Sequence, residues 1–469
     1  MKKLDNPKVQ RALYFIIIVN IACNYIFLYD IYRPHNVDDA WFLAFAFNYF
    51  KFGEILDTTF NGGTTEGLLF FRKTGALFYG YILNKIGWDY GKAQFISALL
   101  MFGSGWFWFL ALQRLNFNIN ERIAFLALFF LMEFSFATAT SLRYESLILF
   151  FQSASLLLLL QKRYFLVGLI SLIAVETHPI AVLNLAYLTG IIISHHFQNN
   201  KPGSMFRVKS NKKEIIYLSL GCIVGLAYYF YLHPISYTSL YKFLYLNSVQ
   251  GVGEYYDTKL GILGLYFFTT KYFRHIPELI IFLVALYLFI SNQLHKEKLF
   301  VLAWILMLIF LSFLRPIFTY AAIILPAFIV LMVSSFQAIR KLNLLLLIFV
   351  CLMVPQYMAV YYLNHNWNRS LYLSEIKSFV PNDGLPVIGS AMSWFALKDR
   401  KNFTSGIYPF HSLKQPKWQE LYLIEDKFYR NKDEYRGTKD YLNKNYSSST
   451  IKTSNQTGGP IVLKQLTLK

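Results

Sequence analysis

The sequence predicts an all-α polytopic membrane domain followed by a small soluble α/β domain, and three observations lead to this fold class. The chain of 469 residues is 55% hydrophobic and only 15% charged, whereas soluble globular chains carry about 25% charged residues. Apolar blocks close to the length of a membrane span, about 20 residues, recur up to Leu363. After Leu363 hydropathy falls, and Asn, Ser and charged residues become frequent. We therefore predict a membrane domain over 1–363 and a soluble domain, here called the tail, over 364–469.

The apolar blocks define most of the predicted spans. They are Ala12–Tyr29, Ala93–Leu112, Ile123–Ala139, Leu147–Leu160, Ile215–Leu232, Leu299–Leu314 and Leu342–Leu363. The segment Tyr164–Ser194 is too long for one span, and Thr177-His178-Pro179 in its middle predicts a break, because proline disfavours a continuous helix. Treating that segment as two short spans, and adding one span between His275 and Lys296 and another between Arg315 and Arg340, gives about eleven transmembrane helices.

The basic residues predict the orientation of these spans. Met1–Arg11 is basic and lacks a small-residue cleavage site, so we interpret it as the start of a retained signal anchor with a cytoplasmic N-terminus. The most basic short connection, Lys201–Lys213, then also falls inside, as the positive-inside rule requires. This topology places the tail and a long first loop (31–91) outside. It also places outside the span boundaries near Arg143, His178 and Arg315.

Composition and motifs exclude several classes of protein. The net charge of +19 could suggest nucleic-acid binding, but no nucleic-acid module is present, so we expect no nucleic-acid partner. The cysteines Cys23, Cys222 and Cys351 lie in apolar spans without motif spacing, which predicts neither disulfides nor a metal site. No Walker loop, HExxH, paired CxxC or GxSxG motif occurs. An enzyme acting on ATP or a sugar nucleotide in the cytosol is therefore disfavoured.

Asp38 and Asp39 begin a stretch that is otherwise apolar and aromatic, which predicts a helix at the membrane interface. One interpretation is a helix cap, since acids suit the start of a helix. The other is a carboxylate held near the bilayer surface, where partial loss of solvent raises its basicity. Two adjacent acids cannot point the same way, so one would face the reaction while the other orients it or binds a cation.

Three more candidates border predicted spans on the same side. Arg143-Tyr144-Glu145 opens the fourth span, either as a membrane anchor or as an arginine that pairs with phosphate and is oriented by Glu145. His178 is either a structural residue or part of a site. Arg315 lies at another outer boundary, followed by Tyr320. Ionisable residues at such positions are candidates for function because a charge near lipid is costly.

At these residues the sequence resembles the GT-C superfamily of membrane glycosyltransferases, and it is similar to the bacterial protein mannosyltransferase-like group within it. The resemblance covers about residues 1–400. Its motifs are the acid pair in the first outside loop (DDAWFLAFAFNYFKFGE, 38–54), Arg-x-Glu within Leu142–Leu147, the Thr-His-Pro kink at Thr177–Pro179, and the late Arg315, Tyr320 and Pro326. Many relatives carry Glu where this chain has Asp39.

The resemblance implies an inverting transferase that moves a sugar from a polyprenyl-phosphate carrier to a glycan, lipid or protein acceptor. It implies a multi-pass protein of the plasma (inner) membrane, in contact with membrane lipid, with its active site and tail on the extracytoplasmic side. The catalytic residues would be Asp38, as the general base, and Asp39. The lipid phosphate or sugar would bind to Arg143, Glu145, His178, Arg315 and Tyr320. No cofactor is firmly expected, although the acid pair could hold a divalent cation.

Other functions remain open at this point. A transporter or flippase of polyprenyl-linked glycans would carry charged groups at mid-membrane depth and broken helices in matching halves. A ligase or polymerase of lipid-linked glycans would share the outer active face. A membrane subunit without chemistry would tolerate the loss of Asp38.

The tail is predicted to be a small α/β domain that covers the active face and helps to hold the acceptor. Val387–Gly389 is predicted as a buried strand, Ser393–Leu397 as the start of a helix, and Ile461–Leu463 as the last strand. Trp418–Tyr429 is predicted as a helix, because Leu421, Ile424 and Phe428 share one helical face.

Overall fold

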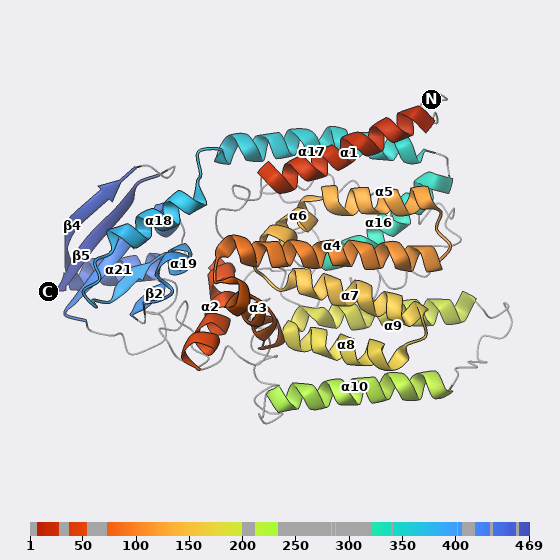
Figure 1. Cartoon of the computed structure of the whole chain (residues 1–469), viewed down its shortest axis with the longest axis horizontal. Helices are drawn as coiled ribbons and strands as arrows, with labels where there is room; N and C mark the ends of the chain where they lie inside the picture. Colours follow the sequence, from red (N-terminus) through yellow and green to blue (C-terminus); the bar gives the residue numbers. More distant parts are fainter. Residues whose placement is uncertain are drawn as a thin grey trace.

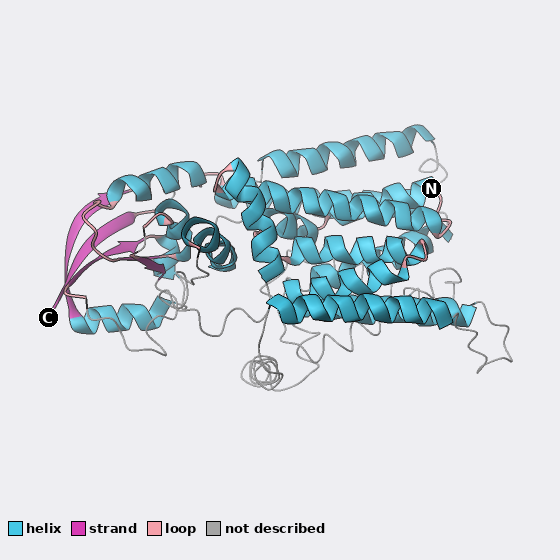
Figure 2. Cartoon of the chain, turned by 60° about the horizontal axis from the view of Figure 1, so that its bottom comes forward, coloured by secondary structure: helices cyan, strands magenta, loops and turns pink. Residues whose placement is uncertain are grey.

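The chain forms a bundle of apolar helices with a small sheet domain at one end (Figure 1). The computed structural model describes residues 7–27, 37–53, 73–198, 212–232, 321–338, 341–400, 402–405, 418–431, 435–455 and 459–469, together with Leu283 and Tyr287. Figure 2 shows the strands of the tail, in magenta, beyond one end of the helical bundle, in cyan. We call the end of the bundle nearest the sheet the tail end. The predicted fold class, a helical membrane domain with a small C-terminal α/β domain, is confirmed.

The bundle is built from long apolar helices. Its elements are α1 (Pro7–Phe27), α4 (Tyr90–Arg114), α5 (Ile119–Leu131), α6 (Glu133–Thr140), α7 (Glu145–Leu160), α8 (Tyr164–Thr177), η1 (Pro179–Ala181), α9 (Val182–Gln198), α10 (Lys212–Leu232), α16 (Ala321–Ala338) and α17 (Leu342–Asn364). Within the described ranges, α4, α10 and α17 are each long and apolar enough to cross a membrane, and the bent pair α5–α6 would make a fourth span. The count of about eleven spans stays a prediction.

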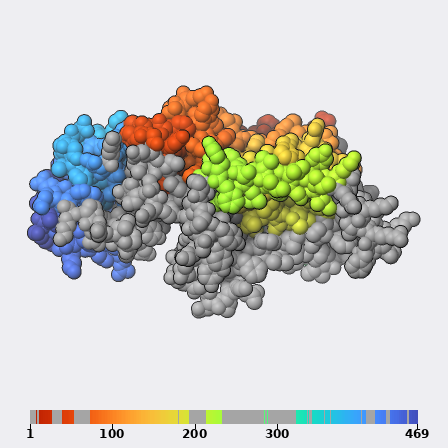
Figure 3. Space-filling view, turned by 90° about the horizontal axis from the view of Figure 1, so that it is seen from below, coloured from red at the N-terminus to blue at the C-terminus, as the bar shows by residue number. Residues whose placement is uncertain are grey.

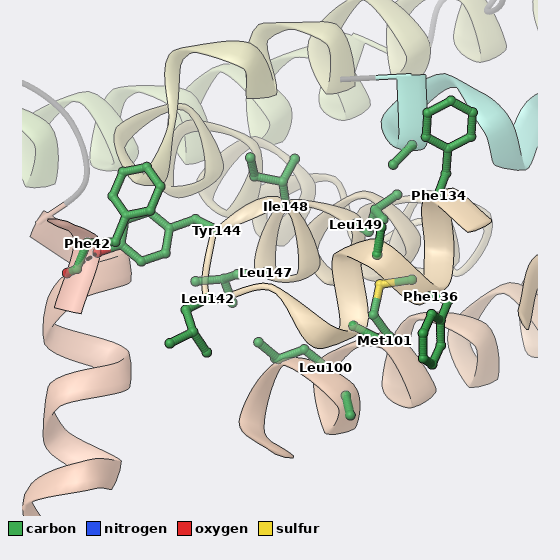
Figure 4. Close-up of a cluster of buried hydrophobic side chains, with 14 of the residues drawn as sticks. Phe42, Leu100, Met101, Phe134, Phe136, Leu142, Tyr144, Leu147, Ile148 and Leu149 are labelled. Atoms are coloured by element: carbon green, nitrogen blue, oxygen red, sulfur yellow. Dashed lines mark hydrogen bonds between the residues drawn. The ribbon is translucent and has the colours of Figure 1, made fainter. Parts of the chain in front are cut away.

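Two helices that are not part of these spans lie at the tail end, α2 (Val37–Phe52) and α3 (Lys73–Ile86) (Figure 1). The predicted interfacial helix after the acid pair is therefore present as α2. Phe42 of α2 packs against Tyr144 with ring centroids 4.6 Å apart, and the Tyr144 hydroxyl donates to the Phe42 carbonyl at 3.1 Å. Figure 4 shows this contact at the edge of a buried cluster that includes Met101 of α4 and Phe136 of α6. The acid-bearing helix is thus fixed to the bundle core.

The predicted span Ile123–Ala139 is bent by 61° between α5 and α6, a feature that the sequence analysis did not anticipate. Met132 at the break has extended backbone angles (φ −67°, ψ 141°), so the helical hydrogen bonding is interrupted there. The carbonyl of Leu131 accepts a hydrogen bond from the Tyr357 hydroxyl of α17 at 2.8 Å. A neighbouring helix thus satisfies a backbone group at the bend, which makes a broken helix tolerable inside a membrane protein.

The predicted break near His178 is confirmed. α8 ends at Thr177, His178 is extended, and a short 3-10 turn leads into α9. α8 also packs closely on α10, because a Cβ atom placed on Gly221 would lie 2.0 Å from the Phe165 carbonyl oxygen. Figure 3 shows that one side of α10 is not covered by other helices. The exposed side chains of α10 are mostly apolar and include Ile216 and Tyr231. This pattern is that of a helix with one face against protein and one toward lipid.

The tail folds around a five-stranded sheet with strand order β2-β1-β3-β5-β4. The strands are β1 (Val387–Gly389), β2 (Phe403–Ser405), β3 (Glu420–Glu425), β4 (Tyr446–Ser454) and β5 (Ile461–Leu468), and the helices are α18 (Arg369–Phe379), η5 (Ala391–Ser393), α19 (Trp394–Leu397), α20 (Lys427–Asn431) and α21 (Arg436–Asn445). β1 pairs in parallel with β2 and β3, while β5 pairs antiparallel with β3 and β4. The predicted strands at 387–389 and 461–463 and the helix start at 393–397 are confirmed.

The predicted helix over Trp418–Tyr429 is wrong. Glu420–Glu425 forms the central strand β3, and only Lys427–Asn431 is helical. Because β3 lies between β1 and β5 and is covered on both faces, Leu421 to Ile424 are all buried. A short strand buried on both faces has no alternating pattern, so its spacing can imitate a helix. The predicted domain boundary after residue 363 falls at the end of α17, and the division into two domains stays a prediction.

Candidate active site

Asp39 lies in the first turn of α2 and is almost completely buried. Its Oδ2 atom accepts a hydrogen bond from the Tyr90 hydroxyl at 2.7 Å, and its Oδ1 atom accepts one from the Leu142 backbone N–H at 2.8 Å. The Ser141 hydroxyl donates to Oδ1 at 3.4 Å. The carboxylate therefore joins α2 to the first residue of α4 and to the turn before α7, so its role extends beyond a helix cap.

Asp38 precedes Asp39 in the same turn of α2, and its side chain lies outside the described part of the chain. Successive residues of an α-helix point in different directions, since 3.6 residues make one turn. With both oxygens of Asp39 engaged by donors from the bundle, Asp39 fits the orienting role that the sequence analysis assigned to one acid of the pair.

Arg143 and Glu145 form a buried ion pair at the start of α7. The Arg143 Nε atom lies 2.8 Å from Glu145 Oε1, and the two side chains are only 9% and 4% exposed. The Arg143 backbone N–H also donates to the Ser141 hydroxyl at 3.0 Å, which places the pair directly beside the turn that binds Asp39. This burial favours the interpretation in which Glu145 orients the guanidinium over that of a lipid-facing anchor.

His178 is buried at the tail end of α8, where its Nδ1 atom accepts a hydrogen bond from the Ile180 backbone N–H at 3.2 Å. This contact fixes the imidazole within the turn that separates α8 from α9. An imidazole held through Nδ1 in this way carries any remaining hydrogen on Nε2. The structure thus places His178 at the predicted boundary, in an ordered position.

Glu176 is a further candidate, and it was not predicted from the sequence. It is fully buried, and its two carboxylate oxygens accept from the backbone N–H groups of Lys73, at 3.0 Å, and Thr74, at 2.9 Å. A carboxylate at this position suits the positive end of the α3 dipole. An acid inside the apolar segment 164–177 was the available signal, since ionisable residues near lipid are functional candidates.

Lys73 is a second residue that was missed. Its side chain is about half buried, and the ammonium group contacts the Leu232 carbonyl at the end of α10. Burial lowers the pKa of the Lys73 amine, and the nearby charge of Glu176 opposes this effect. In sequence Lys73 resembles an ordinary interfacial lysine, so only the fold reveals that it lies beside the buried Glu176 carboxylate.

The helix α3 connects the two groups of candidates. Gly75 of α3 packs closely on Tyr144, because a Cβ added to Gly75 would lie 2.8 Å from the Tyr144 ring. At the start of α3, the first backbone N–H groups donate to the Glu176 carboxylate. The structure therefore brings Asp39, the Arg143–Glu145 pair and the 176–178 turn to the tail end. Arg315 and Tyr320, predicted to belong to the same site, lie outside the described residues.

Glu133 is a further buried acid, at the start of α6 where the span bends. In the sequence it stands alone inside a long apolar block, with no motif around it. Within the described residues, no group of three or more His, Cys, Asp or Glu side chains is arranged to hold a metal ion.

Comparison with solved structures places the whole chain in one fold. A crystal structure of ArnT from Cupriavidus metallidurans in the apo state superimposes with a TM-score of 0.57 at 9% sequence identity, covering 91% of this chain and 93% of that one. A structure of the same enzyme bound to undecaprenyl phosphate gives a TM-score of 0.60 at 9% identity, covering 96% and 97%. No protein-family model and no curated protein sequence matches the chain. The likeness shows that this chain shares the fold of ArnT, as the resemblance to the GT-C superfamily led us to expect.

Proposed function

We propose that the protein is a glycosyltransferase that moves a sugar from a polyprenyl-phosphate carrier to an acceptor at the extracytoplasmic face of the inner membrane. The observation that carries this proposal is the likeness over 96% of the chain to ArnT bound to undecaprenyl phosphate. The gathering of Asp39, Arg143 and Glu145 at one end of the bundle supports it, because the chemistry needs a carboxylate and positive charge together.

In the proposed reaction, Asp38 accepts the proton of an acceptor hydroxyl as that oxygen attacks the anomeric carbon of the sugar. The bond between that carbon and the phosphate oxygen breaks, and the electron pair leaves with the carrier phosphate. Attack from the face opposite the leaving group inverts the anomeric configuration. Asp39 holds the first turn of α2 in place through its three donors, so that Asp38 is positioned for the proton.

The leaving phosphate gains negative charge, which positive groups must stabilise. Arg143 suits this role because Glu145 fixes its guanidinium, and a planar guanidinium can pair with two phosphate oxygens. Lys73, at the start of α3, adds a second cation to the same end of the bundle. His178, Arg315 and Tyr320 complete the proposed set of residues for the phosphate and sugar. A phosphate neutralised in this way needs no general acid.

The direct test is sugar transfer from synthetic polyprenyl-phosphate sugars by the purified protein. Wild type, Asp38→Asn and the matched control Asp440→Asn, an exposed acid on α21, are compared. We expect Asp38→Asn to lose at least about 10³-fold in turnover with an unchanged Tm, since it removes the base, while the control keeps full activity. Equal turnover by Asp38→Asn and wild type would remove Asp38 from the mechanism.

One observation favours a second candidate, movement of a polyprenyl-linked sugar across the membrane. Transporter sites use broken helices and buried charges, and Glu133 lies at the bend between α5 and α6. Proteoliposomes loaded with a labelled carrier lipid distinguish the two functions. Transbilayer movement that depends on Glu133 but not on Asp38 would support the transporter, and transfer without such movement would reject it.

A further inference from the structure

The tail contacts the bundle through Arg369, the first residue of α18, which is buried. Its guanidinium lies 4.4 Å from the centroid of the Tyr90 ring, in the geometry of a cation–π contact. Its Nη1 atom also donates a hydrogen bond to the Gln94 side-chain oxygen at 2.6 Å. One tail residue thus contacts two successive turns of the same face of α4.

Both contacts lead to Asp39. Tyr90 donates its hydroxyl to Asp39 Oδ2 at 2.7 Å. The Gln94 amide donates to the Thr140 carbonyl at 2.5 Å, and Thr140 directly precedes the turn whose Leu142 N–H binds Asp39 Oδ1. Two routes from Arg369 therefore converge on the two oxygens of one carboxylate.

A second tail residue holds the Tyr90 ring from another side. Phe395 of α19 meets it edge to face, with centroids 4.6 Å apart and an interplanar angle of 87°. A ring confined by Arg369 and Phe395 has little freedom to turn its hydroxyl away from Asp39. The position of that hydroxyl is therefore set by the tail as well as by α4.

We propose that the tail positions Asp39 for catalysis, with Tyr90 and Arg369 as positioning residues that act through this carboxylate. This inference rests on the proposed transfer reaction and deepens it. The tail then does more than cover the active face, because it helps to fix the turn of α2 that carries the acid pair.

The test uses Tyr90→Phe, which keeps the ring and its packing but removes the hydroxyl, in the full-length protein. We expect kcat to fall about tenfold, the KM for the lipid donor to stay within about twofold, and Tm to fall slightly, because the buried carboxylate loses one donor. In an Asp39→Ala background, Tyr90→Phe should have no further effect on kcat, because the carboxylate that accepts the Tyr90 hydroxyl is already absent. Arg369→Gln should lower kcat similarly, and Arg369→Lys should restore part of it by keeping a cation over the ring. Tyr441→Phe in α21 is the matched control.

A second readout does not depend on activity. Amide hydrogen exchange at Leu142 and along Val37–Phe52 reports how firmly Asp39 holds the turn and the helix. We expect exchange there to be at least about threefold faster in Tyr90→Phe than in Tyr441→Phe. Unchanged kcat and unchanged exchange would overturn the inference while leaving the transferase proposal in place. Absence of transfer by the wild type would reject the transferase, and the exchange result would then decide the positioning role alone.

Discussion

At the scale of single residues, the buried ionisable groups at the tail end are each matched by specific partners. Asp39 receives three donors, Glu176 receives two backbone N–H groups, and Arg143 is paired with Glu145. Burying a charge is costly unless hydrogen bonds and opposite charges compensate it. These hydrogen bonds and the ion pair fix side chains and helix ends relative to one another, as the proposed reaction centre requires.

The Arg143–Glu145 pair gives the first prediction of stability. Glu145→Ala leaves a buried guanidinium without its carboxylate, and we expect a loss of about 3–5 kcal/mol in the free energy of unfolding. The double variant Arg143→Met/Glu145→Leu should recover much of the stability, because the pair is replaced by apolar groups, but it should remain inactive. Denaturant unfolding and turnover of both variants measure this.

The exposed pair Lys51–Asp399 serves as the control for that experiment. Its side chains are 39% and 58% exposed, and pairs of this kind contribute about 0–1 kcal/mol. Asp399→Asn should therefore change stability little. If Glu145→Ala lost as little stability as Asp399→Asn, the buried pair would not be held in the geometry described above.

Asp426 gives a prediction of pH dependence in the tail. Burial raises the pKa of its carboxyl, although hydrogen bonds from Ser390, Tyr372 and Tyr429 act in the opposite direction. The folded tail therefore binds a proton at a higher pH than the unfolded chain does. Between the raised folded pKa and the unfolded value of about 3.9, the stability contributed by this group increases as pH falls.

The measurement compares the Tm of wild type and Asp426→Asn from about pH 7 to about pH 4. The difference, wild type minus variant, should rise as the pH is lowered, because only the wild type gains from protonation. Asp383 and Asp399 have lowered pKa values and act in the opposite sense in both proteins, so they cancel in the difference. A difference that falls with decreasing pH would contradict the burial argument.

At the scale of elements, the helices with a strong local pattern could be predicted from the sequence. The features that depend on tertiary contacts could not. The break at His178 followed from a proline, and α2 followed from an apolar run after two acids. The bend at Met132 and the strand β3 depend on Tyr357 of α17 and on the neighbouring strands β1 and β5, which no local window contains. The partners of Asp39 could not be predicted for the same reason, because they lie 51 and 103 residues away in sequence.

The contact between α8 and α10 gives a prediction for a pair of elements. Gly221 and Gly225 lie four residues apart on α10, and small residues at this spacing let membrane helices approach closely. In Gly221→Ala the new methyl would meet the Phe165 backbone at 2.0 Å, so the helices must separate. Overpacking costs about 1–3 kcal/mol, against a gain of about 1 kcal/mol in helix propensity.

We therefore expect Gly221→Ala to lower Tm, and to lower turnover as well, because α8 carries the Glu176 carboxylate that holds the start of α3. Ser219→Ala, at an exposed position of the same helix, should leave both unchanged. An increase of Tm in Gly221→Ala would show that the two helices are not in close contact.

At the scale of the whole molecule, the tail and the candidate site occupy the same end of the bundle (Figures 1 and 2). α2 is bound to the tail at several points, including an edge-to-face contact between Phe47 and Trp394 and the ion pair between Lys51 and Asp399. Because the acid pair, the buried arginine and the tail share one end, they must face one compartment. The orientation of the chain in the membrane therefore decides where the proposed reaction takes place.

Site-directed labelling tests this orientation. The background variant has Cys23, Cys222 and Cys351 replaced by Ala. One cysteine is then introduced at a time, either Ser448→Cys on the exposed strand β4 or Gln161→Cys at the opposite end of α7. Intact spheroplasts that carry each variant are treated with a membrane-impermeant maleimide. We expect Ser448→Cys to react at once and Gln161→Cys to react only after the membrane is disrupted, because basic loops such as 161–163 stay inside. Labelling of Gln161→Cys alone in intact spheroplasts would invert the topology. The acid pair would then face the cytoplasm, and a transfer reaction at the outer face would be excluded.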